Sequence, residues 1–209
     1  KIIRDGKNDG LSPKIKLSLQ LVLAVIFTVV YLNNALGTLK VPLIDNPLNL
    51  GIFYSFIVIF MFVGSSNAVN LTDGMDGLSS GTSIIALIPF TVFALKQNQL
   101  SLAIFFFSLL GSLLGYLYFN RKPAKIYMGD CGSLALGGMF AASALVLKKE
   151  LLLIVIGGVF VIETLSVIIQ VASVKLFNKR VFPYTPIHYS FTIKGIREEA
   201  TVLIFYAVG

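Results

Sequence analysis

Residues 67–78 have the sequence Asn67-Ala-Val-Asn-Leu-Thr-Asp-Gly-Met-Asp-Gly-Leu78 and follow directly on a long apolar run. Two amides and two carboxylates recur here at intervals of three residues, at Asn67, Asn70, Asp73 and Asp76. On an α-helix a step of three residues turns by about 300°, so the row stays on one broad face as far as Asp73. Gly74 and Gly77 then allow the backbone to turn tightly.

Polar groups at the boundary of an apolar span are costly unless they bind something, so this stretch indicates a functional site. The alternative is a helix end, because Asn and Asp are common helix caps. One cap needs one such residue and not four, and we therefore favour a site.

The composition indicates a membrane protein. Of 209 residues, 56% are hydrophobic and 13% charged, and the mean hydropathy is +0.86; a soluble domain has about 25% charged residues. The chain begins without Met in a charged segment and ends inside an apolar run. We therefore expect residues 1–209 to form a single membrane-embedded domain that lacks upstream helices. A net charge of +7 is typical of basic cytosolic loops, and no nucleic-acid partner is expected.

Six apolar runs approach the roughly 20 residues needed to span a bilayer. We predict an all-α polytopic integral membrane protein with six complete transmembrane helices, and a seventh that starts after about residue 200. Pro89 is expected to kink the third span. The predicted spans are residues 17–36, 51–69, 78–95, 100–119, 133–147 and 151–174.

Small residues inside two of these spans predict close helix packing. The positions concerned are Gly111 and Gly115 in the fourth span, and Ala135, Gly138 and Ala142 in the fifth. Glu163 is the one acidic residue within the sixth span. A carboxylate at such a position is either functional or paired with a helix from a part of the protein that lies outside this sequence, and both explanations stay open.

Positive charge is distributed unevenly between the two sides that these spans define. All but four of the 17 Lys and Arg residues fall on one side; the four exceptions are Lys40, Lys96, Lys148 and Lys149. Loops rich in Lys and Arg are cytosolic, so we assign this side to the cytosol. Four polar candidates fall on the same side, and the predicted site therefore faces the cytosol: Asp73, Asp76, Asp130 and His188.

Three of these candidates are carboxylates, and if they converge they must share a cation or hold a proton. Mg²⁺ suits them best, because it takes one or two carboxylates and leaves other positions to water and phosphate oxygens. One His and one Cys, far apart, do not make a zinc site. Asp130 is predicted at a loop tip, with the hydroxyl of Ser133 capping the helix that follows.

Two further features have alternative explanations. The basic residues around the acidic ones, including Lys1 and Lys16, either bind phosphates or reflect the charge bias of cytosolic loops. Tyr127 is either an aromatic residue at the membrane interface or a platform on which a flat base stacks.

Three segments together resemble the polyprenyl-phosphate N-acetylhexosamine-1-phosphate transferases. They are residues 67–78, then Pro123-Ala-Lys-Ile-Tyr-Met-Gly-Asp-Cys-Gly-Ser-Leu-Ala-Leu-Gly-Gly138, and Pro186-Ile-His-Tyr-Ser-Phe-Thr-Ile-Lys-Gly195. The resemblance extends along the chain from Gly10, and Leu71-Thr-Asp-Gly74 and Pro123-Ala-Lys125 are similar to the branch that uses muramoyl-pentapeptide.

The resemblance implies an enzyme of peptidoglycan synthesis in the bacterial cytoplasmic (inner) membrane. Such an enzyme transfers phospho-N-acetylmuramoyl-pentapeptide from UDP-MurNAc-pentapeptide to undecaprenyl phosphate, and forms lipid I and UMP with Mg²⁺ as cofactor. Membrane lipids are further expected partners, and a second copy of the chain, forming a homodimer, is an additional candidate.

The resemblance also implies roles for individual residues. Asp130 would be the Mg²⁺ ligand and Tyr127 would stack on uracil, while Lys1 and Lys16 would lie close to the phosphates. Asp73, Asp76 and His188 would complete the catalytic set with Asp130. The remaining substrate-binding residues, including the lining of the uridine pocket, would be Asn67, Asn70, Gly74, Met75 and Asn120.

The sequence departs from the family pattern in two places. The adjacent pair of aspartates that the family needs for activity would precede Lys1. The family's three histidines are here His188, Tyr189 and Ser190. The alternatives are a transferase that uses another UDP-N-acetylhexosamine, a transporter with ion-binding groups at a broken helix, and a non-catalytic assembly scaffold.

Overall fold

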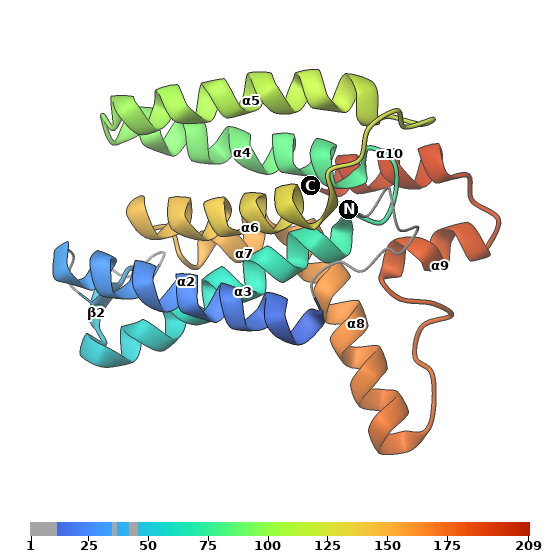
Figure 1. The fold of residues 1–209 in the computed structure, drawn as a ribbon, viewed down its shortest axis with the longest axis horizontal. Helices are drawn as coiled ribbons and strands as arrows, with labels where there is room; N and C mark the ends of the chain where they lie inside the picture. Colours follow the sequence, from blue (N-terminus) through green and yellow to red (C-terminus); the bar gives the residue numbers. More distant parts are fainter. Residues whose placement is uncertain (1–11, 35–36, 42–45) are drawn as a thin grey trace.

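A computed structural model describes residues 12–34, 37–41 and 46–209, and its helices form a bundle (Figure 1). Six of the described helices are long and apolar enough to cross a membrane. They are α2 (Pro13–Asn34), α3 (Tyr54–Thr72), α4 (Leu78–Lys96), α5 (Leu100–Asn120), α6 (Gly129–Val146) and α8 (Gly158–Phe177). The predicted class, an all-α polytopic membrane protein, is confirmed. Lys1 and Gly10 lie outside the described residues.

Shorter elements connect or follow these helices. The segment between α2 and α3 contains the antiparallel strands β1 (Thr38–Leu39) and β2 (Leu48–Asn49), and the 3₁₀ helix η1 (Gly51–Phe53). Helix α7 (Leu152–Ile156) precedes α8, and α9 (Ile187–Ile193) and α10 (Glu198–Val208) follow it. Helix α4 continues through Pro89 as one element.

The sequence prediction was wrong about the start of the fifth span. Helix α6 begins at Gly129, not at Ser133, so Asp130 lies in its first turn and not at a loop tip. The Ser133 hydroxyl donates to the carbonyl of Gly129 at 2.9 Å inside the helix, and does not cap it. The error has a simple cause, because the segment Gly129–Gly132 has no apolar pattern that would mark it as helical.

The predicted sixth span is two helices. Gly157 lies between α7 and α8, where its N–H still donates to the carbonyl of Leu153 at 2.8 Å. Beyond the break, α8 leaves the bundle at an angle (Figure 1). The predicted loop of residues 175–200 contains all of α9 and the start of α10.

Helix α3 is in the middle of the packing, in contact with α2, α6 and α8. Its contact with α6 is close: a Cβ added at Gly137 would lie 2.3 Å from the carbonyl oxygen of Ser65. Gly138 also faces α3, since a Cβ there would lie 3.5 Å from Ser66 Oγ. A second layer of buried aromatic rings joins α4, α6 and α8, where the ring of Phe140 contacts those of Phe90 and Phe160 at a tilt.

The other predicted packing pair does not contact a helix within the described residues. A Cβ added at Gly111 or Gly115 would meet no atom within 4 Å among the described residues. Helix α5 is at one edge of the bundle, where α4 covers one of its sides (Figure 1). The spacing of the two glycines was therefore insufficient to predict where a helix packs.

The two predicted sides are opposite ends of the bundle. Helices α2, α4 and α6 run in one direction and α3 and α5 run in the other, so the start of α2, the turn after α3 and the loop after α5 meet at the right-hand end of Figure 1. The segments that carry Lys40, Lys96 and Lys148 are at the left-hand end. The acidic motifs therefore share one end of the molecule.

The contact between α3 and α6 predicts a stability effect at Gly137. Gly137→Ala should destabilise the fold by about 1–3 kcal/mol, because the added methyl group meets backbone atoms that cannot move aside easily. Gly111→Ala is the control, with open space at its Cβ. Thermal unfolding in detergent measures both; equal midpoints in the two variants would contradict the packing.

Candidate active site

Asp130 is held by residues from two other helices. From α2, Lys16 Nζ forms an ion pair with Asp130 Oδ2, and from α3, Asn70 Nδ2 donates to Asp130 Oδ1 at 2.9 Å. Asn70 Nδ2 also donates to Ser133 Oγ at 2.8 Å. The Asp130 side chain is still 46% exposed, so a ligand can reach it. We call Asp130, Lys16, Asn70 and Asp73 the acidic cluster.

Asp73 is the fourth member of the cluster and is the C-cap of α3. Burial, with a smaller contribution from the negative charge of Asp130, raises the pKa of Asp73 to about 6 from the usual 3.8, while a backbone hydrogen bond from Gly129 opposes this. The two carboxylates are thus close enough to repel each other, and a cation between them would relieve the repulsion.

The donors present fit Mg²⁺ in its usual protein environment. Among the described residues, no three His, Cys, Asp or Glu side chains gather to form a site made of protein ligands alone. Mg²⁺ does not require one, because it binds through one or two carboxylates, water and substrate phosphates. The Lys16 pair is partly exposed, and pairs of that kind are weak enough for a cation to replace the lysine.

Asp76 and Asn120 join two loops within the protein. Asp76 Oδ2 accepts from the N–H of Ala124 at 3.0 Å. Asn120 is buried, accepts at Oδ1 from the Gly77 N–H at 3.1 Å and donates from Nδ2 to the Ile126 carbonyl at 2.9 Å. The two side chains therefore hold the turn of residues 73–77 against the loop of residues 121–128.

Three other predicted substrate-binding residues occupy different surroundings. Asn67 Nδ2 donates to Gln20 Oε1 at 2.7 Å, which links α3 to α2. Met75 packs against an apolar cluster that includes Leu78. Tyr127 is 76% exposed, so its ring is free for either of the roles considered for it.

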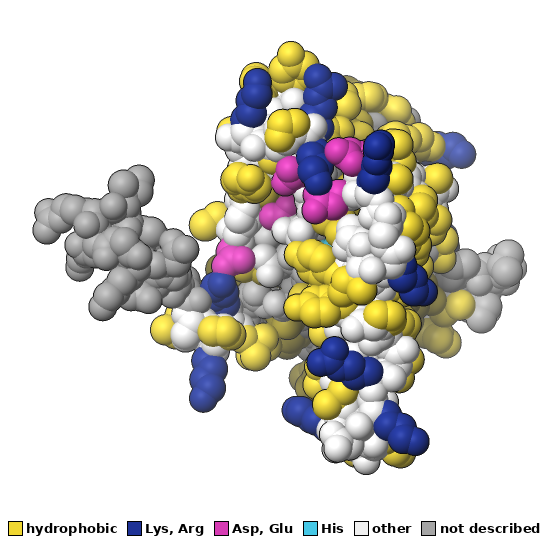
Figure 2. All heavy atoms as spheres, turned by 90° about the vertical axis from the view of Figure 1, so that its right-hand side faces the viewer, with side chains coloured by type: hydrophobic (Ala, Val, Ile, Leu, Met, Phe, Trp, Pro, Cys, Tyr) yellow, Lys and Arg dark blue, Asp and Glu magenta, His cyan; other side chains and the backbone are white. Residues whose placement is uncertain are grey.

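The other basic residues of this end do not all converge on the acidic cluster. Lys122 forms an ion pair with Glu198 at the start of α10, and Arg121 lies over the ring of Tyr118 at 4.9 Å from its centre. Figure 2 shows this end, where most acidic side chains form one group, another lies apart from it, and basic side chains surround them. Lys16 is the described lysine in direct contact with Asp130.

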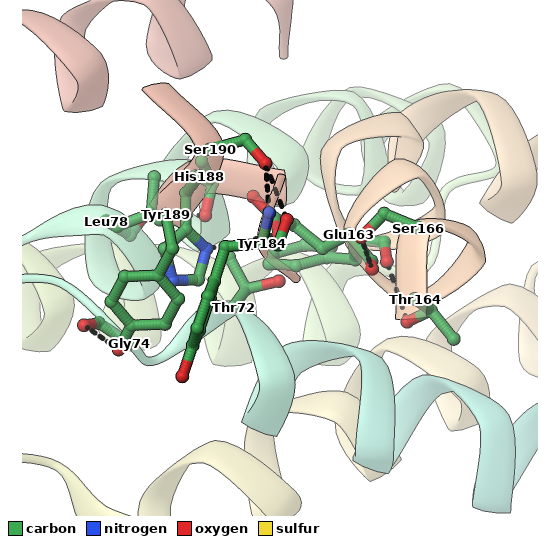
Figure 3. Close-up of polar contacts among 12 residues, drawn as sticks. Thr72, Gly74, Leu78, Glu163, Thr164, Ser166, Tyr184, His188, Tyr189 and Ser190 are labelled. Atoms are coloured by element: carbon green, nitrogen blue, oxygen red, sulfur yellow. Dashed lines mark hydrogen bonds and ion pairs between the residues drawn. The ribbon is translucent and has the colours of Figure 1, made fainter. Parts of the chain in front are cut away.

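His188 is fully buried, and its ring contacts Glu163. Nδ1 of His188 lies 3.1 Å from Oε2 of Glu163, and neither side chain is exposed (Figure 3). Next to it, the Tyr189 hydroxyl donates to the carbonyl of Gly74 at 2.9 Å. The described partner of Glu163 thus belongs to a short helix of this chain, α9, and not to a helix outside this sequence.

Tyr189 and Ser190 stand where the family pattern has histidines. Tyr189 contacts the turn of residues 73–77, as described above. Ser190 Oγ accepts from the N–H of Tyr184 at 3.1 Å and donates to the Tyr184 carbonyl at 2.5 Å. The two replacements therefore hold the segment before α9 and the turn after α3 in place.

We expect the carboxyl group of Asp73 to titrate near pH 6. Because this pKa exceeds the usual 3.8, the folded chain holds the proton more tightly than the unfolded chain. Protonation of Asp73 therefore stabilises the fold in full below about pH 4, and this stabilisation is lost as the pH rises through about 6.

The Asp130→Asn substitution tests the electrostatic part of this shift. It removes the repelling charge, so the pKa of Asp73 should fall toward its usual value, and ¹³C NMR of labelled aspartate carboxyls would measure the change. An unchanged pKa in the variant would show that Asp130 does not act on Asp73.

Comparison with known proteins agrees with the motifs. The family model of glycosyl transferase family 4 matches residues 5–148. The chain is 51% identical to the phospho-N-acetylmuramoyl-pentapeptide-transferase of Geobacillus sp. (strain WCH70), and 52% and 50% identical to those of Geobacillus thermodenitrificans (strain NG80-2) and Bacillus cereus (strain AH187). Each comparison covers 97% of this chain and 63% of the relative, so the chain spans less than two thirds of their length. The family model matches more than half of the residues, and the chain belongs to glycosyl transferase family 4.

Proposed function

We propose that this chain carries the active site of an enzyme that transfers phospho-N-acetylmuramoyl-pentapeptide from its UDP carrier to undecaprenyl phosphate. The products are lipid I and UMP, and the reaction is a step of peptidoglycan synthesis. The observation that carries the proposal is the acidic cluster at one end of six apolar helices. The names of the similar proteins support the choice of substrate.

The position of the cluster suits a reaction between a water-soluble and a lipid substrate. A nucleotide-linked sugar arrives from water, whereas a polyprenyl phosphate keeps its chain in the bilayer and its phosphate at the surface. A site at the ends of α2, α3 and α6 can be reached from both. The excess of Lys and Arg at this end supports a cytosolic orientation, in the bacterial cytoplasmic membrane.

Mg²⁺ is the cofactor we propose, and Asp130 and Asp73 are the residues that would hold it. When bound, Mg²⁺ would supply positive charge that stabilises the diphosphate and the departing UMP. Lys16 supplies a further positive charge next to Asp130. Asn70 orients the Asp130 carboxylate through the hydrogen bond to Oδ1.

We propose that the nucleotide base binds between the turn of residues 73–77 and the loop of residues 121–128. Asp76 and Asn120 support this location, because their hydrogen bonds hold the turn and the loop together. The exposed ring of Tyr127 belongs to that loop and has a flat face to offer to uracil. Asp76 and Asn120 would thus act on the substrate by fixing the walls of its pocket.

The direct test of the function is release of UMP by the full-length protein in vesicles that contain undecaprenyl phosphate. We expect UMP with UDP-MurNAc-pentapeptide and Mg²⁺, and at least tenfold less with UDP-N-acetylglucosamine. Faster release with UDP-N-acetylglucosamine would assign the chain to another branch of the family. No release with either sugar, by protein that binds UMP, would favour a non-catalytic protein.

Base stacking predicts a graded effect at Tyr127. Tyr127→Phe keeps the ring and should bind UMP about as well as wild type. Tyr127→Ala should lose about 1–3 kcal/mol, the usual value of base–aromatic stacking, which is roughly a 5- to 150-fold weaker Kd. Tyr118→Ala is the control, because it removes another exposed ring at the same end. Calorimetric UMP binding that is equal in both alanine variants would make Tyr127 an interfacial residue.

A further inference from the structure

Glu163 is a carboxylate inside a membrane-spanning helix, and its surroundings are unusual. The side chain is fully buried in α8, and its Oε2 lies 3.1 Å from Nδ1 of His188. Neither carboxylate oxygen of Glu163 and neither ring nitrogen of His188 has a hydrogen-bond partner in the part of the chain that the structure describes, so the two side chains are in contact only as an ion pair. A buried carboxylate is costly, and pairs of this kind contribute little net stability compared with apolar residues of similar size. Stability alone therefore does not explain why Glu163 is there.

The contact with Glu163 fixes which side of the imidazole faces the site. Nδ1 is on the side of the ring that faces Glu163, at ion-pair distance from its carboxylate. The opposite nitrogen, Nε2, then faces away from α8. It points toward Gly74, where an added Cβ would lie 2.5 Å from Nε2 and 2.9 Å from Cε1. No side chain larger than that of glycine fits between the ring and the turn.

Helix α9 makes a second contact with the same residue. The Tyr189 hydroxyl donates to the carbonyl of Gly74 at 2.9 Å, and the Tyr189 ring lies against the His188 ring at 4.2 Å between centres (Figure 3). Gly74 directly follows Asp73, a member of the acidic cluster. Glu163, His188 and Gly74 thus form a continuous contact from the interior of α8 to the acidic cluster.

We infer that Glu163 is a positioning residue of the site: it holds the His188 ring against Gly74 and thereby fixes the turn that carries Asp73. The inference rests on the proposed function for its catalytic consequence, but its structural content does not depend on which substrate binds. Glu163 itself is not in contact with the acidic cluster, and its effect on the reaction passes through His188.

Three variants of the full-length protein test this: Glu163→Gln, His188→Gln and the double variant. Turnover is expressed per UMP-binding site, so that incomplete folding is not mistaken for a slower reaction. Each single variant should lose about 10- to 100-fold in kcat, the scale for removing a group that orients a catalytic ligand. The double variant should lose no more than the more damaged single variant, because Glu163 acts through His188.

Thr164→Val is the matched control. Thr164 is the residue after Glu163 in α8, and its hydroxyl donates to the carbonyl of Phe160 in the same helix, so the substitution changes no contact with α9 or the turn. We expect its turnover to equal that of wild type. Glu163→Gln within threefold of wild type would overturn the inference. So would a double variant whose loss is the product of the two single losses, which would mean that the residues act independently.

A second measurement does not depend on the reaction. Hydrogen exchange of the backbone amides of residues 74–78 should become at least tenfold faster in Glu163→Gln, while exchange in the turn between α4 and α5 should stay the same. Unchanged exchange at residues 74–78 would overturn the inference even if the protein proved to have another activity. Conversely, faster exchange in a protein that releases no UMP would contradict the proposed function alone.

Discussion

The structure of the site depends on keeping charged groups together at the end of an apolar bundle. The ion pair of Lys16 with Asp130 and the hydrogen bond from Asn70 join the ends of α2, α3 and α6 at one point. A charge placed deeper in the spans would cost several kcal/mol, whereas here the Asp130 side chain keeps contact with water. Its place in the first turn of α6 adds the favourable interaction of a negative charge with a helix N-terminus.

The repulsion between carboxylates at this end also supports the proposal that the acidic cluster binds a cation. Asp73 and Asp130 repel each other, and part of the resulting strain appears as the raised pKa of Asp73. In the described structure, the ion pair with Lys16 balances the negative charge of Asp130. A divalent cation with phosphate groups would satisfy both carboxylates at once, which is the arrangement that a reaction on a diphosphate requires.

Apolar length was enough to predict that there are six spans, and the alternation of the spans between two sides was enough to place the acidic motifs at one end. The break at Gly157 was not predictable, because the apolar run continues on both sides of that glycine. The start of α6 was missed for the opposite reason, since its first turn, Gly129–Gly132, has no apolar pattern. Within the candidate site, the sequence predicted Asp73 and Asp130, but it could not show that Asp76 and Asn120 form hydrogen bonds with the loop of residues 121–128. The sequence also could not predict the contact of Glu163 with His188. The two residues are 25 positions apart, and their contact depends on how α8 and α9 pack.

The central claim, that Asp130 is the centre of a divalent cation site, is tested most directly by metal binding. Electron paramagnetic resonance of Mn²⁺ added to the full-length protein measures binding without substrate or turnover. We expect Asp130→Asn to weaken Mn²⁺ binding at least tenfold. Asp76→Asn should bind Mn²⁺ as wild type does, because an amide oxygen can still accept from the Ala124 N–H. Equal Mn²⁺ affinity in wild type and Asp130→Asn would contradict the account.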